Sequence, residues 1–125
     1  MTRAIILVGI GGGLGSILRY LTTVLANRYF QGSFPLGTFA VNIIGCLLIG
    51  LLLGLFEKQQ LTHPEGRYLL ITGFCGGYTT FSAFASENIN LFQSGHSFTA
   101  FLYIAASVLL GLIAVWAGLS LTKIF

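Results

Sequence analysis

The sequence predicts an all-α integral membrane protein, with four transmembrane helices in a single domain over residues 1–125. Hydrophobic residues make up 55% of the 125 residues and charged residues only 7%, whereas a typical soluble domain carries about 25% charged residues. The mean hydropathy is correspondingly high, at +0.90. Charged residues divide the chain into four long apolar stretches, each close to the roughly 20 residues that a membrane-spanning helix needs.

The first predicted helix covers about residues 4–26, and Arg19 is the charged residue within it. A charged side chain at membrane depth is costly, so Arg19 is expected either to reach the interface or to face water and raise the local potential for anions. The second predicted helix covers 36–56 and contains no charge. Pro35 precedes it, which suits a helix start because proline is tolerated in the first turn.

The third and fourth helices are predicted at 69–93 and 98–121, separated by a polar turn. The third is interrupted by Gly73–Phe84, a segment with adjacent glycines, two threonines and a serine. A backbone freed from helical bonding costs several kcal/mol in lipid, unless it is buried in protein or lines a cavity. Such breaks can present carbonyl groups to ions. We therefore predict an ion site here, with an unwound portion from Gly76 to Thr79 and a helix that restarts at Thr80.

Charge and glycine placement bear on topology and assembly. With four spans, one side of the membrane carries Arg3, Lys58, Arg67 and Lys123, and the other carries Arg28, together with Arg19 if its side chain reaches the interface. This weak bias favours cytoplasmic termini but allows insertion in both orientations.

Small residues form stripes suited to close helix packing, and four short helices enclose little space, so we expect a homo-oligomer. The stripes are Gly9, Gly13 and Ser16; Gly50 and Gly54; and Ser107, Gly111, Ala114 and Gly118.

Several functional classes are disfavoured. No Ser/His/Asp or Cys/His set has a recognisable catalytic spacing, so the chain is not expected to be an enzyme. Cys46 and Cys75 lie in apolar runs without metal-ligand spacing, which indicates small buried side chains. The six basic residues are dispersed, so no nucleic-acid partner is expected.

Polar and aromatic residues inside the predicted helices are the candidate functional groups. Asn42 is interpreted either as a helix–helix hydrogen-bonding residue or as an amide donor that faces a pore. Glu87 could pair with a basic group, accept bonds from hydroxyls or belong to a proton relay. Phe81 and Phe84 share a helical face, and their electropositive ring edges could favour an anion. Further polar residues align with these at helical spacing: Thr38, Thr80, Ser82, Tyr103 and Ser107.

Three motifs in this order resemble one known family. They are Gly11-Gly12-Gly13-Leu14-Gly15-Ser16 with Arg19-Tyr20, then Gly37-Thr38 with Asn42 and Gly45, then Gly73-Phe74-Cys75-Gly76-Gly77-Tyr78-Thr79-Thr80-Phe81-Ser82. The chain resembles the Fluc, or CrcB, fluoride channels over nearly its whole length.

The resemblance implies a passive, fluoride-selective channel that exports cytoplasmic fluoride across the plasma (inner) membrane of a microbe, as a multi-pass protein. It also implies a homodimer of oppositely oriented subunits in the lipid bilayer, with two pores along the interface and a structural sodium ion on the dimer axis. Carried over by position, the backbone carbonyls of Gly76 and Thr79 would coordinate sodium. Phe81 and Phe84 would offer ring edges to fluoride, and Asn42 an amide. The expected polar pore lining is Thr38, Thr80, Ser82, Tyr103 and Ser107.

Two alternatives remain open on the residues alone. A proton-coupled exporter resembling the small four-helix multidrug transporters would need a titratable carboxylate at the membrane centre, for which only Glu87 is available. Uptake of an organic cation that is abolished by Glu87→Gln would support it. An assembly subunit without transport activity would instead use its glycine stripes to bind a larger complex.

Overall fold

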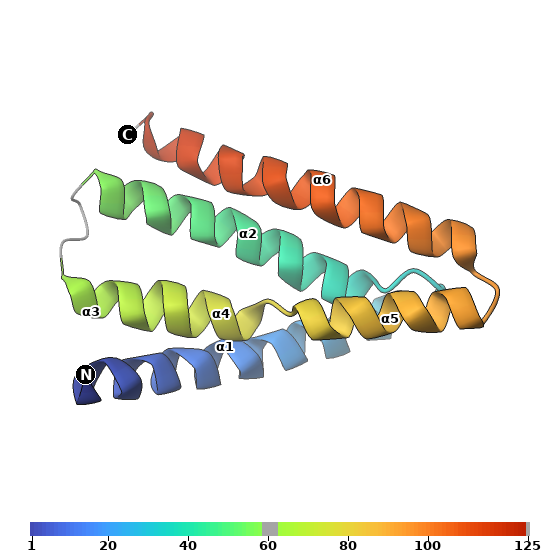
Figure 1. The fold of residues 1–125 in the computed structure, drawn as a ribbon, viewed down its shortest axis with the longest axis horizontal. Helices are drawn as coiled ribbons and strands as arrows, with labels where there is room; N and C mark the ends of the chain where they lie inside the picture. Colours follow the sequence, from blue (N-terminus) through green and yellow to red (C-terminus); the bar gives the residue numbers. More distant parts are fainter. Residues whose placement is uncertain (59–62, 125) are drawn as a thin grey trace.

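The computed structural model describes residues 1–58 and 63–124, and every regular element within them is helical (Figure 1). Three helices are long: α1 (Thr2–Tyr29), α2 (Leu36–Glu57) and α6 (Ser97–Thr122). Between α2 and α6 lie four shorter helical segments that follow one another: α3 (Pro64–Gly66), the π-helix η1 (Arg67–Cys75), α4 (Gly76–Tyr78) and α5 (Phe81–Gln93).

The three long helices lie where helices were predicted, at 4–26, 36–56 and 98–121, with ends that extend by up to three residues. Each is long and apolar enough to cross a membrane. The helix predicted at 69–93 differs, because it begins at Pro64 and is interrupted at Thr79–Thr80. Its two halves lie end to end in one line (Figure 1). Part of the polar loop predicted between the second and third helices lies outside the described residues.

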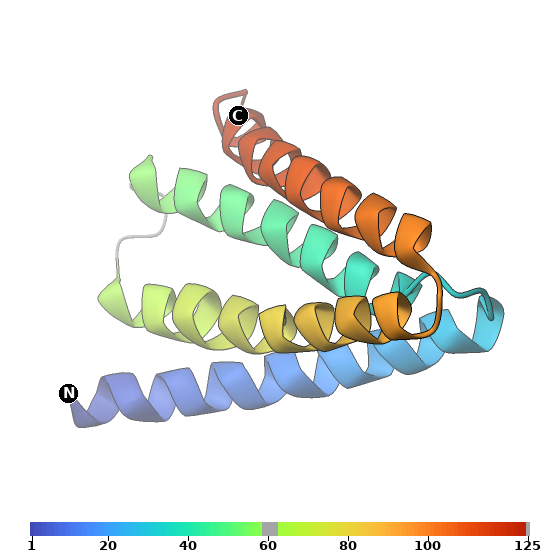
Figure 2. The ribbon, with the colours of Figure 1, turned by 45° about the vertical axis from the view of Figure 1, so that its right-hand side comes forward.

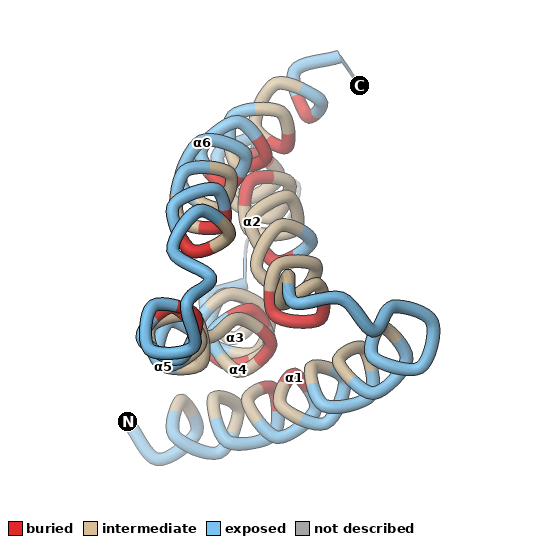
Figure 3. Tube along the Cα trace, turned by 90° about the vertical axis from the view of Figure 1, so that its right-hand side faces the viewer, coloured by how far each residue is buried: buried red, intermediate tan, exposed pale blue. Residues whose placement is uncertain are grey.

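The helices pack so that the two halves of the broken helix have different partners. The first half, η1 with α4, packs against α1, whereas α5 packs against α6 (Figures 1 and 2). α2 lies between α6 and the broken helix and contacts both. Buried residues gather where α1 meets the broken helix and where α2 meets α6 (Figure 3). Much of the apolar outer surface of α1 and α6 is exposed, as expected for helices in contact with lipid.

Glycines bring the backbones of α1 and the broken helix into direct contact. A Cβ atom at Gly15 would overlap the backbone at Phe74 and Tyr78, and one at Gly77 would overlap the backbone of Gly12. Of the predicted stripe of Gly9, Gly13 and Ser16, Ser16 contacts the broken helix, since its Oγ donates to the Gly77 carbonyl at 3.5 Å. Gly9 and Gly13 do not, because a Cβ atom at either position would meet nothing within 4 Å. The glycine spacing was therefore assigned to the wrong face of α1.

The stripes on α2 and α6 are confirmed as packing surfaces. A Cβ atom at Gly50 would overlap the backbone at Val115, and one at Gly118 would overlap the backbone at Leu47 and Leu51. Gly54 lies against the side chain of Thr122 in the same way. Small residues therefore allow α2 and α6 to approach closely along their length, as is common between membrane helices.

The start of α1, the end of α2, the start of α3 and the end of α6 lie at one end of the bundle (Figure 1). Arg3 Nη1 lies 3.1 Å from Glu65 Oε1, and Lys58 Nζ donates a hydrogen bond to the carbonyl oxygen of Thr122. The Arg67 guanidinium lies 5.3 Å from the centre of the Phe56 ring. These contacts place Arg3, Lys58 and Arg67 at the same end, and Lys123 directly follows Thr122 there, as the pattern of charges predicted.

Candidate functional site: a broken helix between two cavities

The break in the helix consists of Thr79 and Thr80, both in extended conformations. Their (φ, ψ) angles are (−88°, 161°) and (−152°, 121°). The predicted unwound portion from Gly76 to Thr79 is corrected, because Gly76 to Tyr78 remain helical as α4. Gly77 packs on the α1 backbone, which holds this turn in place, and the extended conformation falls instead on two β-branched threonines, which favour it.

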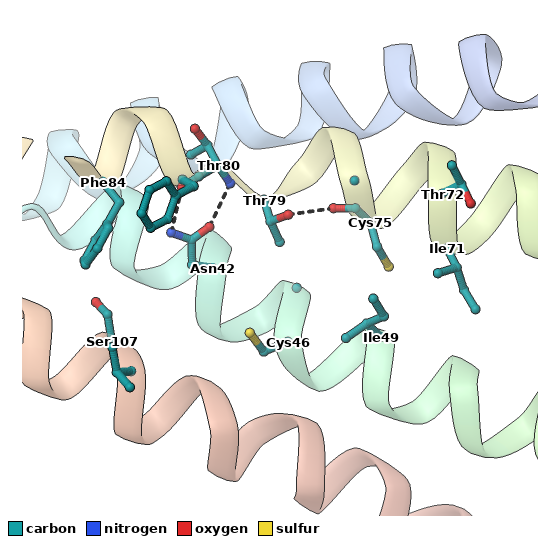
Figure 4. A pocket seen from close by; sticks show the side chains of 14 residues that line it. Asn42, Cys46, Ile49, Ile71, Thr72, Cys75, Thr79, Thr80, Phe84 and Ser107 are labelled. Atoms are coloured by element: carbon teal, nitrogen blue, oxygen red, sulfur yellow. Dashed lines mark hydrogen bonds between the residues drawn. The ribbon is translucent and has the colours of Figure 1, made fainter. Parts of the chain in front are cut away.

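Asn42 on α2 pairs with both backbone groups of Thr80. The Thr80 N–H donates to Asn42 Oδ1 at 2.8 Å, and Asn42 Nδ2 donates to the Thr80 carbonyl at 3.0 Å (Figure 4). The first bond replaces the helical bond from the Thr80 N–H to the Gly76 carbonyl, which the break removes and which matters where water is scarce. The second adds to the first helical bond of α5, which the carbonyl of an N-cap residue accepts. Of the two interpretations of Asn42, helix-to-helix hydrogen bonding is thus present. The amide has a second N–H, which Thr80 does not use.

The carbonyls of Gly76 and Thr79 are left without the amide donors that an α-helix would supply. In a continuous helix they would accept from Thr80 N and Ala83 N respectively. Within the described residues, Thr80 N instead donates to Asn42, and Ala83 N donates to Thr80 Oγ1 at 3.2 Å. The break causes both bonds. It frees the Thr80 N–H to bind Asn42, and it makes Thr80 the N-cap residue of α5, whose hydroxyl accepts from Ala83 N. Uncharged backbone oxygens of this kind are suitable ligands for a small, hard cation.

A cavity of about 470 Å³ lies beside the break, between α2 and α6 on one side and the broken helix on the other (Figure 4). Seven of the predicted site residues line it: Asn42, Gly76, Thr79, Thr80, Phe81, Phe84 and Ser107. The lining also includes residues that the sequence reasoning missed: Gly45, Cys46, Ile49, Ile71, Thr72, Cys75 and Val108. Cys46 follows Asn42 by one helical turn, a spacing that could have revealed it.

Aromatic rings border this cavity. The rings of Phe81 and Phe84 have centroids 5.7 Å apart at an angle of 46°. The Phe84 ring also meets Tyr103 nearly at right angles, with centroids 4.9 Å apart. Phe81 remains 79% exposed in this single chain, whereas Tyr103 is completely buried. The two phenylalanines are therefore brought together as predicted, but Tyr103 lies behind Phe84 rather than in the cavity.

A second cavity, of about 350 Å³, is more polar and lies on the α1 side of the break. It is lined by Arg19, Thr38, Thr80 and Glu87 of the predicted residues, together with Ser16, Tyr20, Thr23 and Ala83. Thr80 lines both cavities. The break therefore separates an outer polar cavity from the cavity beside the phenylalanines.

Glu87 accepts two hydroxyl hydrogen bonds within this region. Thr38 Oγ1 donates to Glu87 Oε2 at 2.7 Å, and Tyr103 Oη donates to Glu87 Oε1 at 2.8 Å. Of the roles considered for Glu87, acceptance of bonds from hydroxyls is the one present. A hydroxyl has a single proton, so Thr38 and Tyr103 have no further proton to donate to an anion in this arrangement.

Two polar atoms near the cavities are buried without a hydrogen-bond partner in the described part of the chain: Arg19 Nε and Ser107 Oγ. Arg19 is partly buried and lines the polar cavity, so it faces that cavity rather than lying wholly at the interface. Ser107 lines the cavity that Phe84 borders. Ser82 is exposed, lines neither cavity, and lies 3.4 Å from Thr80 Oγ1.

Comparison with known proteins gives the family. Residues 6–119 match the family model described as CrcB-like protein, Camphor Resistance (CrcB). A protein of Flavobacterium psychrophilum named fluoride-specific ion channel FluC is 57% identical over 121 residues, covering 97% of this chain and 98% of that protein. Proteins of the same name from Azobacteroides pseudotrichonymphae and Rhizobium etli are 46% and 47% identical, covering 100% and 94% of both chains. The resemblance found in the motifs is confirmed: the chain belongs to the CrcB family, together with these proteins named as fluoride channels.

Proposed function

We propose that this protein is a passive, fluoride-selective channel that exports fluoride from the cytoplasm across the plasma membrane. The observation that carries the proposal is identity of up to 57%, over nearly the whole chain, to proteins named fluoride-specific ion channel FluC. The relatives are named as channels, which also agrees with the expectation that the chain is not an enzyme. The broken helix between two cavities is a suitable framework for ion permeation.

We further propose that the broken helix is a fourth membrane span and that two oppositely oriented copies form the channel. Gly76 and Phe81 are exposed in the single chain, although they flank a break in a membrane helix. Broken backbone at membrane depth is tolerated only where protein covers it or water reaches it. A second copy placed against this face would cover it and complete the cavity.

A structural sodium ion would be held by the carbonyls of Gly76 and Thr79 from both copies. The support for these ligands is that both line the cavity and that their helical donors bind elsewhere. When bound, such a cation would contribute positive potential close to an anion path in a poorly screened region. The protein's own part is to hold the four oxygens in position, through Asn42, the Thr80 cap and the packing of α4.

Fluoride would pass between the polar cavity and the cavity beside the phenylalanines, with donors replacing its water shell. Arg19 supplies positive charge to the polar cavity. Along the larger cavity, Ser107 Oγ has no hydrogen-bond partner among the described residues, and Asn42 Nδ2 has a second N–H besides the one that the Thr80 carbonyl accepts. The edges of the Phe81 and Phe84 rings would add weak electropositive contacts.

The first test is efflux from liposomes that contain the purified protein, followed with a fluoride-selective electrode. We expect rapid fluoride efflux, little chloride efflux under the same conditions, and slower fluoride efflux when sodium is removed from both solutions. Chloride efflux as fast as fluoride efflux would contradict the selectivity. Fluoride efflux that is independent of sodium would contradict the proposed cation.

Replacing Phe81 and Phe84 by isoleucine tests the aromatic contacts. Isoleucine keeps an apolar side chain but removes the electropositive ring edge, so each change is expected to lower the fluoride efflux rate at least tenfold, or about 1.4 kcal/mol. Phe101, an exposed phenylalanine on α6 that lines neither cavity, is the matched control. If the variants at Phe81, Phe84 and Phe101 all give the same fluoride efflux as the parent protein, the rings of Phe81 and Phe84 do not lie on the fluoride path.

A further inference from the structure

The last turn before the break carries Tyr78, whose side chain is tied to α1. Tyr78 is only 6% exposed, and its hydroxyl lies 3.1 Å from Thr22 Oγ1. Its ring stacks almost parallel to Phe74, with centroids 6.0 Å apart and an angle of 8°. Neither Tyr78 nor Thr22 lines either cavity, so any effect of this pair on the ion path acts through the backbone.

The direction of the hydrogen bond between the two hydroxyls follows from the other contact of Thr22. Thr22 Oγ1 donates its single proton to the Leu18 carbonyl at 2.8 Å, so it can only accept from Tyr78. The tyrosine hydroxyl therefore donates, and a short chain of bonds runs from Tyr78 through Thr22 to the α1 backbone. Removal of the tyrosine hydroxyl would leave no buried donor unsatisfied.

Tyr78 lies between the two carbonyls that border the cavity. It follows Gly76 by two residues and directly precedes Thr79. The surrounding space is tight, because a Cβ atom at Gly15 would overlap the Tyr78 amide, and one at Gly45 would lie 3.6 Å from the Tyr78 ring. α1 therefore contacts the backbone of this turn, and α2 approaches its ring. A rotation of Tyr78 would turn the carbonyls of Gly76 and Thr79 with it.

We infer that the Thr22–Tyr78 hydrogen bond is a positioning contact, which holds the Gly76 and Thr79 carbonyls in the orientation that binds the cation. This inference rests on the proposed function for the identity of the cation, but the orientation of the break can be measured independently. Asn42 fixes the second residue of the break, Thr80, and Tyr78 fixes the residue that precedes the break. The two contacts together leave Thr79 as the only residue between them.

The experiment compares Tyr78→Phe, Thr22→Val and the double variant with the parent, and uses Tyr29→Phe and Thr22→Ser as controls. Tyr29 is 80% exposed, and serine keeps the acceptor hydroxyl. The first measurement is the sodium concentration that gives half-maximal fluoride efflux from liposomes. The second is amide hydrogen exchange across residues 76–84 in the absence of sodium.

We expect the half-maximal sodium concentration to rise about fivefold in Tyr78→Phe and in Thr22→Val, as for the loss of one neutral hydrogen bond. The double variant should show the same rise as each single variant, because the bond between Thr22 and Tyr78 is absent in all three. Efflux at saturating sodium should be unchanged, and amide exchange at 76–84 should be faster. Both controls should behave like the parent.

An unchanged half-maximal sodium concentration together with unchanged amide hydrogen exchange at residues 76–84 in Tyr78→Phe would overturn the inference. So would lower maximal efflux at an unchanged half-maximal sodium concentration, which is the result of general destabilisation. If efflux by the parent does not depend on sodium, the proposed cation fails, and the exchange measurement then decides the positioning role: faster exchange in both single variants supports it, and equal exchange rejects it.

Discussion

Replacing Asn42 by aspartate is expected to reduce fluoride efflux at least tenfold while leaving part of the fold intact. Aspartate can accept from the Thr80 N–H, as Asn42 Oδ1 does at 2.8 Å. It cannot donate to the Thr80 carbonyl, which Asn42 Nδ2 binds at 3.0 Å. The loss of one hydrogen bond costs roughly 0.5–1.5 kcal/mol, and a carboxylate here also places a negative charge beside the anion path. Fluoride-electrode recording of liposome efflux measures the result.

Two further variants separate charge from structure. Asn42→Ala removes both bonds and is expected to destabilise the protein by roughly 1–3 kcal/mol, because it leaves the Thr80 N–H without its acceptor. Asn90→Asp is the control, because Asn90 is an exposed residue that lines neither cavity. Normal efflux from Asn42→Asp in a fully folded protein would show that the break needs only the acceptor.

Replacing Gly15 by alanine is expected to destabilise the protein by about 1–3 kcal/mol, the usual range for overpacking. The added methyl group would overlap the backbone at Phe74 and Tyr78, and neither is a flexible side chain that could move aside. Separation of α1 from the broken helix would also disturb the turn before Thr79. The measurement is the fraction of protein that remains monodisperse after heating in detergent, together with efflux.

Gly13→Ala is the matched control on the same helix. A Cβ atom at Gly13 would meet nothing within 4 Å, and alanine has a helix propensity about 1 kcal/mol better than glycine. Gly13→Ala should therefore be as stable as the parent or more stable. Equal losses in both variants would mean that any added methyl group on α1 is harmful, and that the close contact with the broken helix is not the cause.

The amino-acid sequence by itself determined the class of protein and the position of the helices. Long apolar stretches must be helical in lipid, because every backbone group then has to be satisfied within the segment. This reasoning found α1, α2 and α6 to within three residues at each end. It also found the interrupted helix, since glycines, threonines and a serine at membrane depth are a conspicuous departure from an ordinary span.

Only the tertiary structure decided which residues break the helix and which contacts support the break. The adjacent glycines suggested Gly76 and Gly77 as the unwound residues, but both are helical, because packing on α1 favours a turn with no side chain. The bonds from Asn42 to Thr80 join residues 38 positions apart, and no local pattern indicates such a pair. The hydroxyl bonds to Glu87 are also long-range, from Thr38 on α2 and Tyr103 on α6.

For the packing faces of the helices, too, the sequence determined some features and only the tertiary structure decided others. On α2 and α6 the glycine stripes were assigned correctly from spacing alone, since their small residues at four-residue intervals are consistent with one face. On α1, glycines occur at Gly9, Gly11, Gly12, Gly13 and Gly15, so that small residues cover more than one face. The sequence therefore predicted close helix packing, and only the position of the broken helix decided that Gly11 and Gly15 carry it. Periodicity records which residues share a face, whereas the identity of the packed face depends on a neighbouring helix that is distant in the chain.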